Sequence, residues 1–241
     1  MTLKRTQDRK TANLSNKAGT QSVIANAFSL PAGRAFSCSG ATPFCEKICY
    51  AGRLEKVYKG FKAVVMHNWE TINSGNMLTL LDNMIAEFVR ECEKRNAPKL
   101  FRIHADGDFF SQQYATAWAM VIKAYPDVQF WVYTRSFTEE LNVIPTIANI
   151  DNLSVYLSVD VDNRGLVSDV IRDYPDIRLA TLGETAADAA DIMAEWRTRP
   201  GAKCPENIKA IPLIDTNAGA CVNCDLCVRG KADVRFAIKK R

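Results

Sequence analysis

Apolar and polar residues follow one another along this chain in blocks of two kinds, one with helical and one with strand periodicity. Between residues 77 and 92, apolar side chains recur at the i, i+3, i+4 and i+7 spacing of an amphipathic helix. Ser111 and Thr185 stand where helix N-caps are expected, and Asp188 completes a capping box. Four further helices are predicted, marked by the apolar residues of 114–125, 138–150, 166–174 and 189–196.

Short apolar runs between these helices predict strands. They begin near residues 100, 128, 153, 177 and 209, after a first strand within residues 22–30. Strands that alternate with helices run parallel and are joined by right-handed crossovers. About six β/α units are fewer than the eight of a closed barrel. The sequence therefore predicts an α/β fold, a partial (β/α)6 TIM-like barrel, with a doubly wound sheet as the alternative.

Three segments are expected from this pattern. Residues 1–21 form a basic N-terminal tail, residues 22–214 form the partial barrel, and residues 215–241 form a cysteine-rich C-terminal extension. We expect the extension to pack on the barrel together with Cys204.

Polar residues cluster directly after the predicted strands, where parallel β/α folds place their active sites. His104 can carry a proton or bind a metal, although a structural histidine is the alternative. Asp106 and Asp108 can bind substrate or cap the next helix. Arg135 can hold a carboxylate or phosphate through two hydrogen bonds, or form a surface ion pair. These four residues, His104, Asp106, Asp108 and Arg135, are the candidate catalytic residues.

Composition narrows the protein class. The chain has 241 residues, of which 47% are hydrophobic and 24% charged, which is typical of a soluble globular protein. No apolar run approaches the roughly 18–20 residues that span a bilayer, and the N-terminus lacks the apolar centre of a secretory signal. We therefore expect a cytoplasmic protein without a membrane partner. In a reducing cytoplasm, clustered cysteines are expected to bind metals or take part in catalysis.

The net charge of +4 does not decide the function by itself. Basic residues gather at both ends of the chain, and we interpret these ends as solvated tails. Electrostatic contact with nucleic acid is the alternative. The basic residues concerned are Lys4, Arg5, Arg9, Lys10, Lys17, Arg229, Lys231, Arg235, Lys239, Lys240 and Arg241.

The C-terminal cysteines form a tight metal-binding pattern. Cys221, Cys224 and Cys227 have the spacing C-x2-C-x2-C, and Cys204 lies upstream. Such spacing is typical of iron–sulfur ligation, and four thiolates also suit a tetrahedral zinc site. Both metals therefore remain candidates here, with iron–sulfur preferred.

The N-terminal cysteines form a second group. Cys38, Cys45 and Cys49 have the spacing C-x6-C-x3-C in the loop after the first predicted strand. Three thiolates can hold a [4Fe-4S] cluster while one iron stays open to substrate or cofactor. Alternatively, Cys204 or His104 supplies a fourth ligand. The eighth cysteine, at position 92, lies on an apolar helix stripe and is expected to be a buried small hydrophobe.

Several of these motifs resemble a family of phage-encoded proteins, the gene-product-eighty-eight-like family of mycobacteriophages. The resemblance covers most of the chain from about residue 25 to 230. It rests on the cysteine pattern and CYAGR at 38–53, FRIHADGDFFSQQY at 101–114, WVYTRS at 131–136 and the C-terminal CVNCDLC. A phage-encoded protein of this kind would act in the host cytoplasm.

More distantly, the arrangement is similar to radical S-adenosylmethionine enzymes, β/α barrels whose first loop carries three cysteines on a [4Fe-4S] cluster. The sequence departs from their C-x3-C-x2-C motif, because Gly52 stands where the third cysteine is expected and Cys38 lies upstream instead. This resemblance implies S-adenosylmethionine as a cofactor, a second cluster on the C-terminal cysteines and an electron donor such as ferredoxin or flavodoxin. The cofactor-binding residues expected from it are Asp106, Gly107, Asp108, Ser136 and Asp160.

Three functional hypotheses follow. The first is an iron–sulfur protein, with one or two clusters, that acts as a radical-type enzyme on a substrate still to be identified. The second is a zinc- or cluster-stabilised protein that binds nucleic acid without catalysis. The third is an electron carrier.

Overall fold

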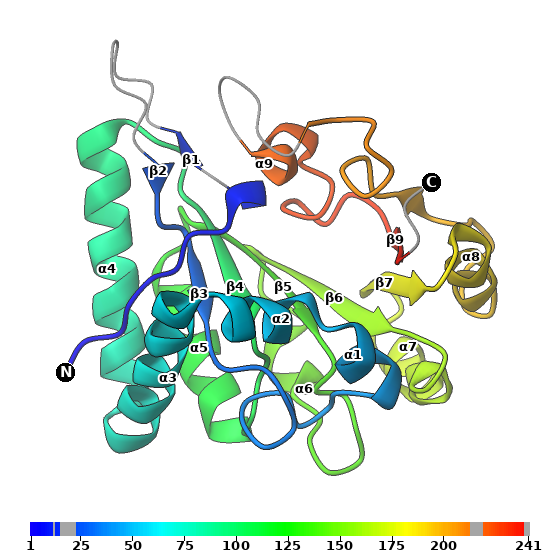
Figure 1. The fold of residues 1–241 in the computed structure, drawn as a ribbon, viewed down its shortest axis with the longest axis horizontal. Helices are drawn as coiled ribbons and strands as arrows, with labels where there is room; N and C mark the ends of the chain where they lie inside the picture. Colours follow the sequence, from blue (N-terminus) through cyan, green and yellow to red (C-terminus); the bar gives the residue numbers. More distant parts are fainter. Residues whose placement is uncertain (12, 15–22, 213–218, 239–241) are drawn as a thin grey trace.

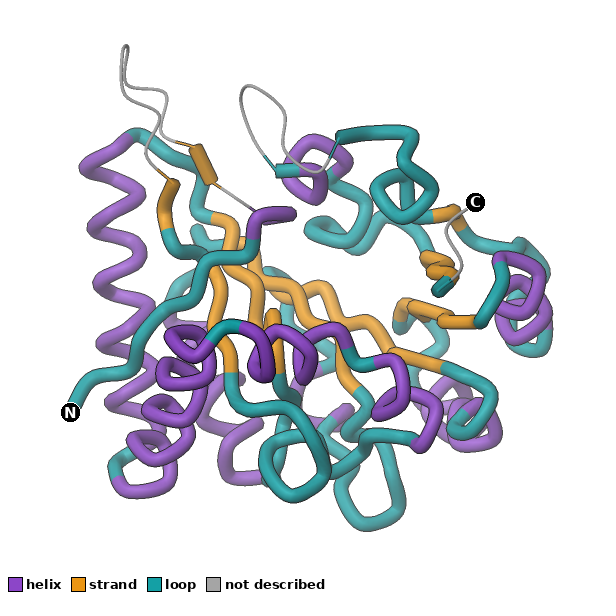
Figure 2. Tube along the Cα trace, viewed as in Figure 1, coloured by secondary structure: helices purple, strands orange, loops and turns teal. Residues whose placement is uncertain are grey.

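A seven-stranded parallel sheet forms the centre of the protein (Figures 1 and 2). The computed structural model describes residues 1–11, 13–14, 23–212 and 219–238. The strands, in their order across the sheet, are β3 (Ala27–Ser29), β4 (Leu100–Asp106), β5 (Gln129–Thr134), β6 (Leu153–Val159), β7 (Arg178–Gly183), β9 (Val234–Ala237) and β8 (Ala202–Lys203). A separate antiparallel pair, β1 (Asn13–Leu14) and β2 (Val23–Ile24), precedes it.

Helices connect the parallel strands. Their bounds are α1 (Pro43–Ile48), α2 (Tyr50–Val57), α3 (Lys59–Ser74), α4 (Met77–Arg95), α5 (Gln112–Ala124), α6 (Ile144–Ile147), α7 (Val167–Asp173), α8 (Ala186–Ala194) and α9 (Ala220–Cys224). Two short 3-10 turns, η1 (Arg9–Thr11) and η2 (Arg164–Leu166), complete the described elements. The predicted caps are confirmed, since Ser111 accepts a hydrogen bond from Tyr114 N and Thr185 forms a capping box with Asp188. None of the described helices is long and apolar enough to cross a membrane.

The sheet is open, so the structure confirms an α/β fold with parallel strands but not a closed barrel. Strands β3 to β7 lie side by side in the order in which they occur along the chain. A doubly wound sheet would reverse direction within this series, and no reversal is present among these five strands. Within the described residues, no strand joins the two edges β3 and β8.

The predicted last strand, which begins near residue 209, is wrong. Lys209 has a φ of 59°, which is not compatible with an extended strand, and residues 206–211 form turns and a bend. Pro212 also lacks the N–H that a sheet ladder requires. Residues 213 and 214 of this prediction lie outside the described part. The place beside β7 is taken instead by β9, from the predicted C-terminal extension.

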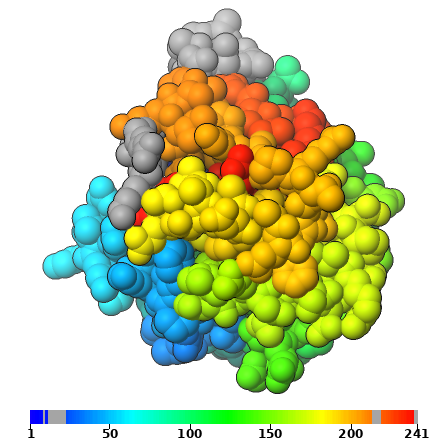
Figure 3. Space-filling view, turned by 90° about the vertical axis from the view of Figure 1, so that its right-hand side faces the viewer, coloured from blue at the N-terminus to red at the C-terminus, as the bar shows by residue number. Residues whose placement is uncertain are grey.

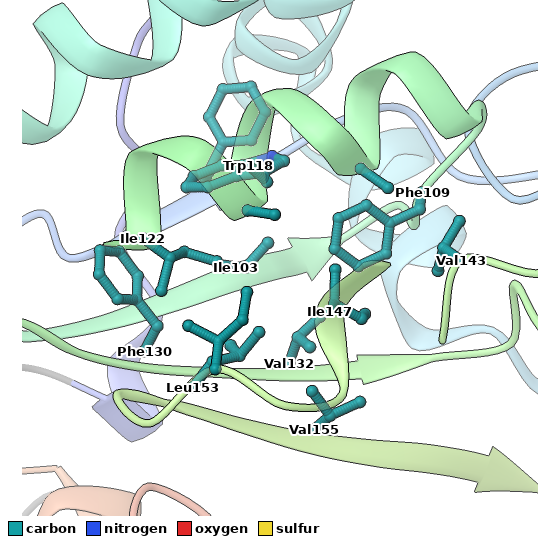
Figure 4. Close-up of a cluster of buried hydrophobic side chains, with 14 of the residues drawn as sticks. Ile103, Phe109, Trp118, Ile122, Phe130, Val132, Val143, Ile147, Leu153 and Val155 are labelled. Atoms are coloured by element: carbon teal, nitrogen blue, oxygen red, sulfur yellow. The ribbon is translucent and has the colours of Figure 1, made fainter. Parts of the chain in front are cut away.

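The crossover helices cover one face of the sheet and form the main hydrophobic core with it (Figure 4). In Figure 4, Trp118 and Ile122 of α5 lie over Ile103, Phe130 and Val132 of β4 and β5. All five side chains are buried. Burial of side chains of this size stabilises the fold by roughly 1.5–3 kcal/mol each.

The opposite face of the sheet carries the C-terminal segment, which includes the short helix α9. Trp131 of β5 packs with Val228, and Tyr156 of β6 packs with Val234 of β9. The Tyr156 hydroxyl also donates to the carbonyl oxygen of Ala232, at 2.9 Å. On the face shown in Figure 3, the orange and red C-terminal residues lie directly against the yellow segment that carries α8. Alternate residues of the central strands therefore separate the helix-side core from a second, cysteine-lined face.

The first eleven residues pack on the protein rather than extending as a solvated tail. Leu3, Thr6 and Thr11 are buried. Thr6 exchanges two backbone hydrogen bonds with Ala27 of β3, at 2.7 and 3.1 Å. The basic residues Lys17, Lys239, Lys240 and Arg241 lie outside the described residues.

Candidate metal and cofactor site

Loops from four neighbouring strands meet at the carboxyl edge of the sheet. A buried ion pair joins two of them, because Arg135 Nη1 after β5 lies 2.6 Å from Asp160 Oδ2 after β6. The same carboxylate oxygen accepts a hydrogen bond from Thr42 Oγ1 at 2.7 Å. Thr42 is the N-cap of α1, and its hydroxyl accepts from Cys45 N at 3.0 Å. Asp160 therefore anchors the N-terminal cysteine loop to the centre of the sheet.

Asp108 forms a second anchor at this edge. Its carboxylate accepts hydrogen bonds from Phe109 N and Thr134 Oγ1, both at 2.7 Å, and from Arg135 N at 2.6 Å. Its own N–H donates to Ser37 Oγ at 3.3 Å. Burial raises the pKa of Asp108 to about 6, although these hydrogen bonds oppose the rise. Because these four hydrogen bonds engage the buried carboxylate and its backbone N–H, the structure gives Asp108 a positioning role.

Gly107 and Ser136 are closely packed in the loops that follow β4 and β5. Gly107 has a φ of 87°, and a Cβ at this position would lie 2.6 Å from Ser37 Oγ, so only glycine fits. Ser136 is fully buried and donates to the carbonyl oxygen of Phe109 at 2.6 Å. The structure thus gives both residues backbone-positioning roles in the loops that carry the expected cofactor-binding residues.

His104 lies in the hydrophobic core and not among the side chains that line the cavity. Its ring lies on the helix side of the sheet, where Nε2 is 2.9 Å from the hydroxyl of Tyr114 and the ring packs against Phe109 and Trp118. Burial and the charge of Arg102 lower the pKa of His104 to about 3, which keeps the ring neutral. The structure therefore places His104 as a structural histidine, the alternative stated above.

Asp106 lies beside a second carboxyl group at the edge. Burial and the adjacent Glu55 carboxyl raise the pKa of Asp106 well above its ordinary value. Asp106 Oδ1 accepts from Gly107 N, while the buried Oδ2 has no hydrogen-bond partner among the described residues. Glu55 in turn accepts from Ala32 N at 2.8 Å, which ties α2 to the loop after β3. Asp106 and Glu55 thus form a pair of neighbouring carboxyl groups at this edge of the sheet.

A cavity of about 540 Å³ lies between α1 and α2, the sheet and the C-terminal segment. Its volume is within the roughly 300–1,000 Å³ range of small-molecule and cofactor sites. Apolar side chains such as Ile48, Leu182 and Phe236 form much of its wall. Six of the eight cysteines line it: Cys45, Cys49, Cys204, Cys221, Cys224 and Cys227.

The N-terminal thiols surround the Asp106 and Asp108 loop. Burial raises the pKa of the Cys38 thiol to about 12, and the nearby Asp108 and Asp106 carboxylates add to the rise. Burial likewise raises the pKa of Cys45 and of Cys49. The Asp108 carboxylate adds to the rise at Cys45, and the Asp106 carboxylate adds to the rise at Cys49. Cys49 also caps α2, since its sulfur accepts from Gly52 N at 3.3 Å. Cys38 lies near the same carboxylates but does not line the cavity.

The C-terminal thiols form one interacting group on the sheet face. Burial raises the pKa of Cys221 to about 12, while Arg102 opposes the rise and the Cys227 and Cys204 thiols add to it. Burial raises the pKa of Cys227 to about 11, with further contributions from Cys204 and Cys224. The Cys221 and Cys227 thiols therefore lie within electrostatic range of other cysteines of this group.

The donor set of this cavity fits a thiolate-bound metal centre. All eight cysteines are free, and the raised thiol pKa values mean that a bound metal must displace their protons. In the described part of the chain, no three His, Cys, Asp or Glu side chains gather around one point as a mononuclear site requires. Six of the thiols instead line the wall of the cavity.

Sequence reasoning did not single out Arg102, Tyr133 or Thr42 as site residues. Arg102 and Tyr133 project from β4 and β5 into the cavity, and Thr42 links Asp160 to the cysteine loop. Arg102 carries a recognisable signal, since a cation stands inside the otherwise apolar strand LFRI. For Thr42, the signal is its position as the residue before Pro43 at a helix start.

Comparisons with known proteins place this chain among phage proteins. Residues 1–230 match the family described as Gene product 88. The Gene 88 protein of Mycobacterium phage L5 is 47% identical over 247 residues, which cover 99% of both chains. The Gene 88 protein of Mycobacterium phage D29 is 44% identical over 248 residues, again covering 99% of both chains. No solved structure matches the chain.

Proposed function

The chain belongs to the Gene product 88 family, whose relatives are phage proteins, and we propose that it is an iron–sulfur cluster-binding protein. The observation that carries this proposal is the convergence of six cysteines from three separate parts of the chain on one cavity. Cysteine thiolates are the usual ligands of iron–sulfur clusters. A metal site built from one local motif would need cysteines from only one part of the chain. Here Cys45 and Cys49 line the same cavity as Cys204, Cys221, Cys224 and Cys227.

We assign the cysteines to two sites. Cys204, Cys221, Cys224 and Cys227 supply four thiolates, which complete the ligand set of one [4Fe-4S] cluster. Cys38, Cys45 and Cys49 supply three thiolates around the Asp106 loop and hold a second cluster. The second cluster keeps one iron open, as catalytic metal sites keep an open position.

Zinc at the C-terminal cysteines is the second candidate. Four cysteine thiolates suit a structural zinc ion, which would make the C-terminal segment a stabilising module of a nucleic-acid-binding protein. A zinc ion requires its thiolates at about 2.3 Å from one point. The tight C-x2-C-x2-C spacing of Cys221, Cys224 and Cys227 is the reason for preferring an iron–sulfur cluster over zinc. An electron carrier with the same clusters but no catalysis remains the third candidate.

We further propose that the open N-terminal cluster serves S-adenosylmethionine chemistry. When reduced by a donor such as ferredoxin or flavodoxin, the cluster would supply the electron that cleaves the sulfonium. The chain's own contribution is the position of the site, because the Asp160, Arg135 and Thr42 contacts hold the cysteine loop at the edge of the sheet.

Metal analysis of cysteine variants tests the assignment. The protein is purified without oxygen as the wild type and as the C49S, C224S and C92S variants, and iron, sulfide and zinc are measured per chain. Cys92 is buried on α4 and donates to the carbonyl oxygen of Pro98, so C92S is the matched control. We expect C49S and C224S each to lose part of the iron and C92S to keep all of it. Iron content unchanged in C49S and C224S would refute the two-site assignment.

A separate incubation tests the catalytic part of the proposal. The wild type is reduced with dithionite under anaerobic conditions and mixed with S-adenosylmethionine, and 5′-deoxyadenosine is quantified. Formation of this product in the wild type and its loss in C49S are expected. Iron-loaded protein that forms none would remove the radical-enzyme proposal and leave the electron-carrier or structural function.

A further inference from the structure

Arg102 is a buried cation on the cysteine-lined face of the sheet. Its side chain is 12% exposed and lines the cavity together with the four C-terminal cysteines. The guanidinium carbon lies 5.5 Å from the ring centroid of Tyr133, which projects into the same cavity from β5. A buried charge is costly unless an opposite charge and hydrogen bonds compensate it.

The N-terminal segment supplies part of this compensation. Asp8 Oδ2 forms an ion pair with Arg102 Nη1, and Asp8 Oδ1 accepts from Lys10 N at 2.9 Å. Lys10 in turn pairs with Glu206 at 2.9 Å, two residues after Cys204. Two ionic contacts therefore tie residues 8–10 to the sheet and to the loop of the first C-terminal ligand.

The compensation is incomplete. Arg102 Nε is buried and has no hydrogen-bond partner among the described residues. An unpaired buried N–H donor is rare in folded proteins and calls for an acceptor. The positive charge of Arg102 also lowers the pKa of both Cys221 and Cys227, which places it within electrostatic range of these two sulfurs.

We propose that Arg102 is the positioning and charge-balancing residue of the C-terminal thiolate site, and that Asp8 fixes its guanidinium there. This inference rests on the proposed iron–sulfur function. A thiolate-bound cluster is anionic, so it would attract the Arg102 guanidinium and supply the acceptor sulfurs that Arg102 Nε lacks. A nearby cation stabilises the reduced, more negative form of a cluster and so raises its reduction potential.

Reduction potentials of charge variants test this role. The wild type and the R102Q, R102K and D8N variants are purified without oxygen, and iron content and the midpoint potential of the C-terminal cluster are measured. The signal of that cluster is identified as the one lost in C224S. R102Q removes a positive charge and is expected to lower the potential and the iron content. D8N removes a negative charge but keeps an oxygen acceptor for Arg102, and is expected to raise the potential.

Opposite shifts distinguish charge balance from a general structural role, which would move both variants in the same direction. R102K keeps the positive charge, so its midpoint potential is expected to lie closer to that of the wild type than to that of R102Q. R5Q is the matched control, because Arg5 is 10% exposed, pairs with Glu91 at 2.7 Å and lies 5.8 Å from the Phe88 ring, away from the cavity. R5Q is expected to leave the potential unchanged.

Three results would overturn the inference. They are an unchanged potential in R102Q, shifts of the same sign in R102Q and D8N, or an effect of R5Q equal to that of R102Q. If R102Q does not fold, the direction of the shift in D8N still tests the inference. A wild type without iron would refute the proposed function itself, and the inference with it.

Discussion

The ion pair between Arg135 and Asp160 gives the sharpest prediction about how the N-terminal cysteine loop is held. The side chains are 8% and 0% exposed, and the N–O distance is 2.6 Å. D160N keeps the shape of the side chain and an oxygen for Thr42, but it removes the charge that balances Arg135. Removal of one partner of a buried pair costs about 3–5 kcal/mol, because the other charge stays buried without compensation. We expect D160N to lower the free energy of unfolding by about this amount.

Urea denaturation of the metal-free protein measures the effect directly. D169N is the control, because Asp169 pairs with Arg172 at a similar 2.9 Å but the side chains are 77% and 67% exposed. Exposed pairs contribute about 0–1 kcal/mol. In the double variant R135M/D160N neither charge of this pair remains, so most of the lost stability should return. A loss in D160N below about 1 kcal/mol, or equal to that in D169N, would refute the reasoning.

Two further predictions concern residues of the same region. Burial and the charge of Arg102 lower the pKa of His104 to about 3. As the pH falls below about 6.5, the histidine is therefore protonated in the unfolded state but not in the folded state, and the free energy of unfolding falls by about 1.4 kcal/mol per pH unit. Asparagine tolerates the φ of 58° at this position, so H104N is a suitable variant. H104N should remove this contribution to the pH dependence of the free energy of unfolding, measured by urea denaturation between about pH 6.5 and 4.5. Parallel plots of unfolding free energy against pH for the two proteins would contradict this prediction. G40A would place a Cβ 2.1 Å from the Arg135 carbonyl oxygen and should cost about 1–3 kcal/mol, measured by thermal unfolding. Gly60 lies in helix α3, and a Cβ there would have no atom within 4 Å, so G60A should leave the stability unchanged or increase it. Equal effects of G40A and G60A would be inconsistent with this packing.

Periodicity predicted strands β3 to β7 and helices α4 to α8, because their apolar residues recur with strand or helix spacing. It did not predict β8 or β9. The sequence VRFA at 234–237 is short, and its place in the sheet depends on a chain reversal that local pattern does not encode. The apolar run at 209–214 offered a stronger signal, but Lys209 and Pro212 prevent it from pairing as a strand.

The site shows the same limit at the level of single side chains. In regular strand alternation, Arg102 and His104 would share one face, so a site with His104 at its mouth was a reasonable expectation. The φ of 58° at His104 interrupts the alternation and turns the ring into the helix-side core, while Arg102 faces the cysteines. The expectation that strand ends bring polar residues together is confirmed for Asp106, Asp108, Arg135 and Asp160, which the structure places at one edge of the sheet.

The central claim is that these cysteines hold iron and sulfide. It is tested most directly by measuring iron, acid-labile sulfide and zinc together in wild-type protein purified without oxygen. The account predicts a brown protein with iron and sulfide in equal amounts and no stoichiometric zinc. A colourless protein that holds zinc, or one without bound metal, would contradict it.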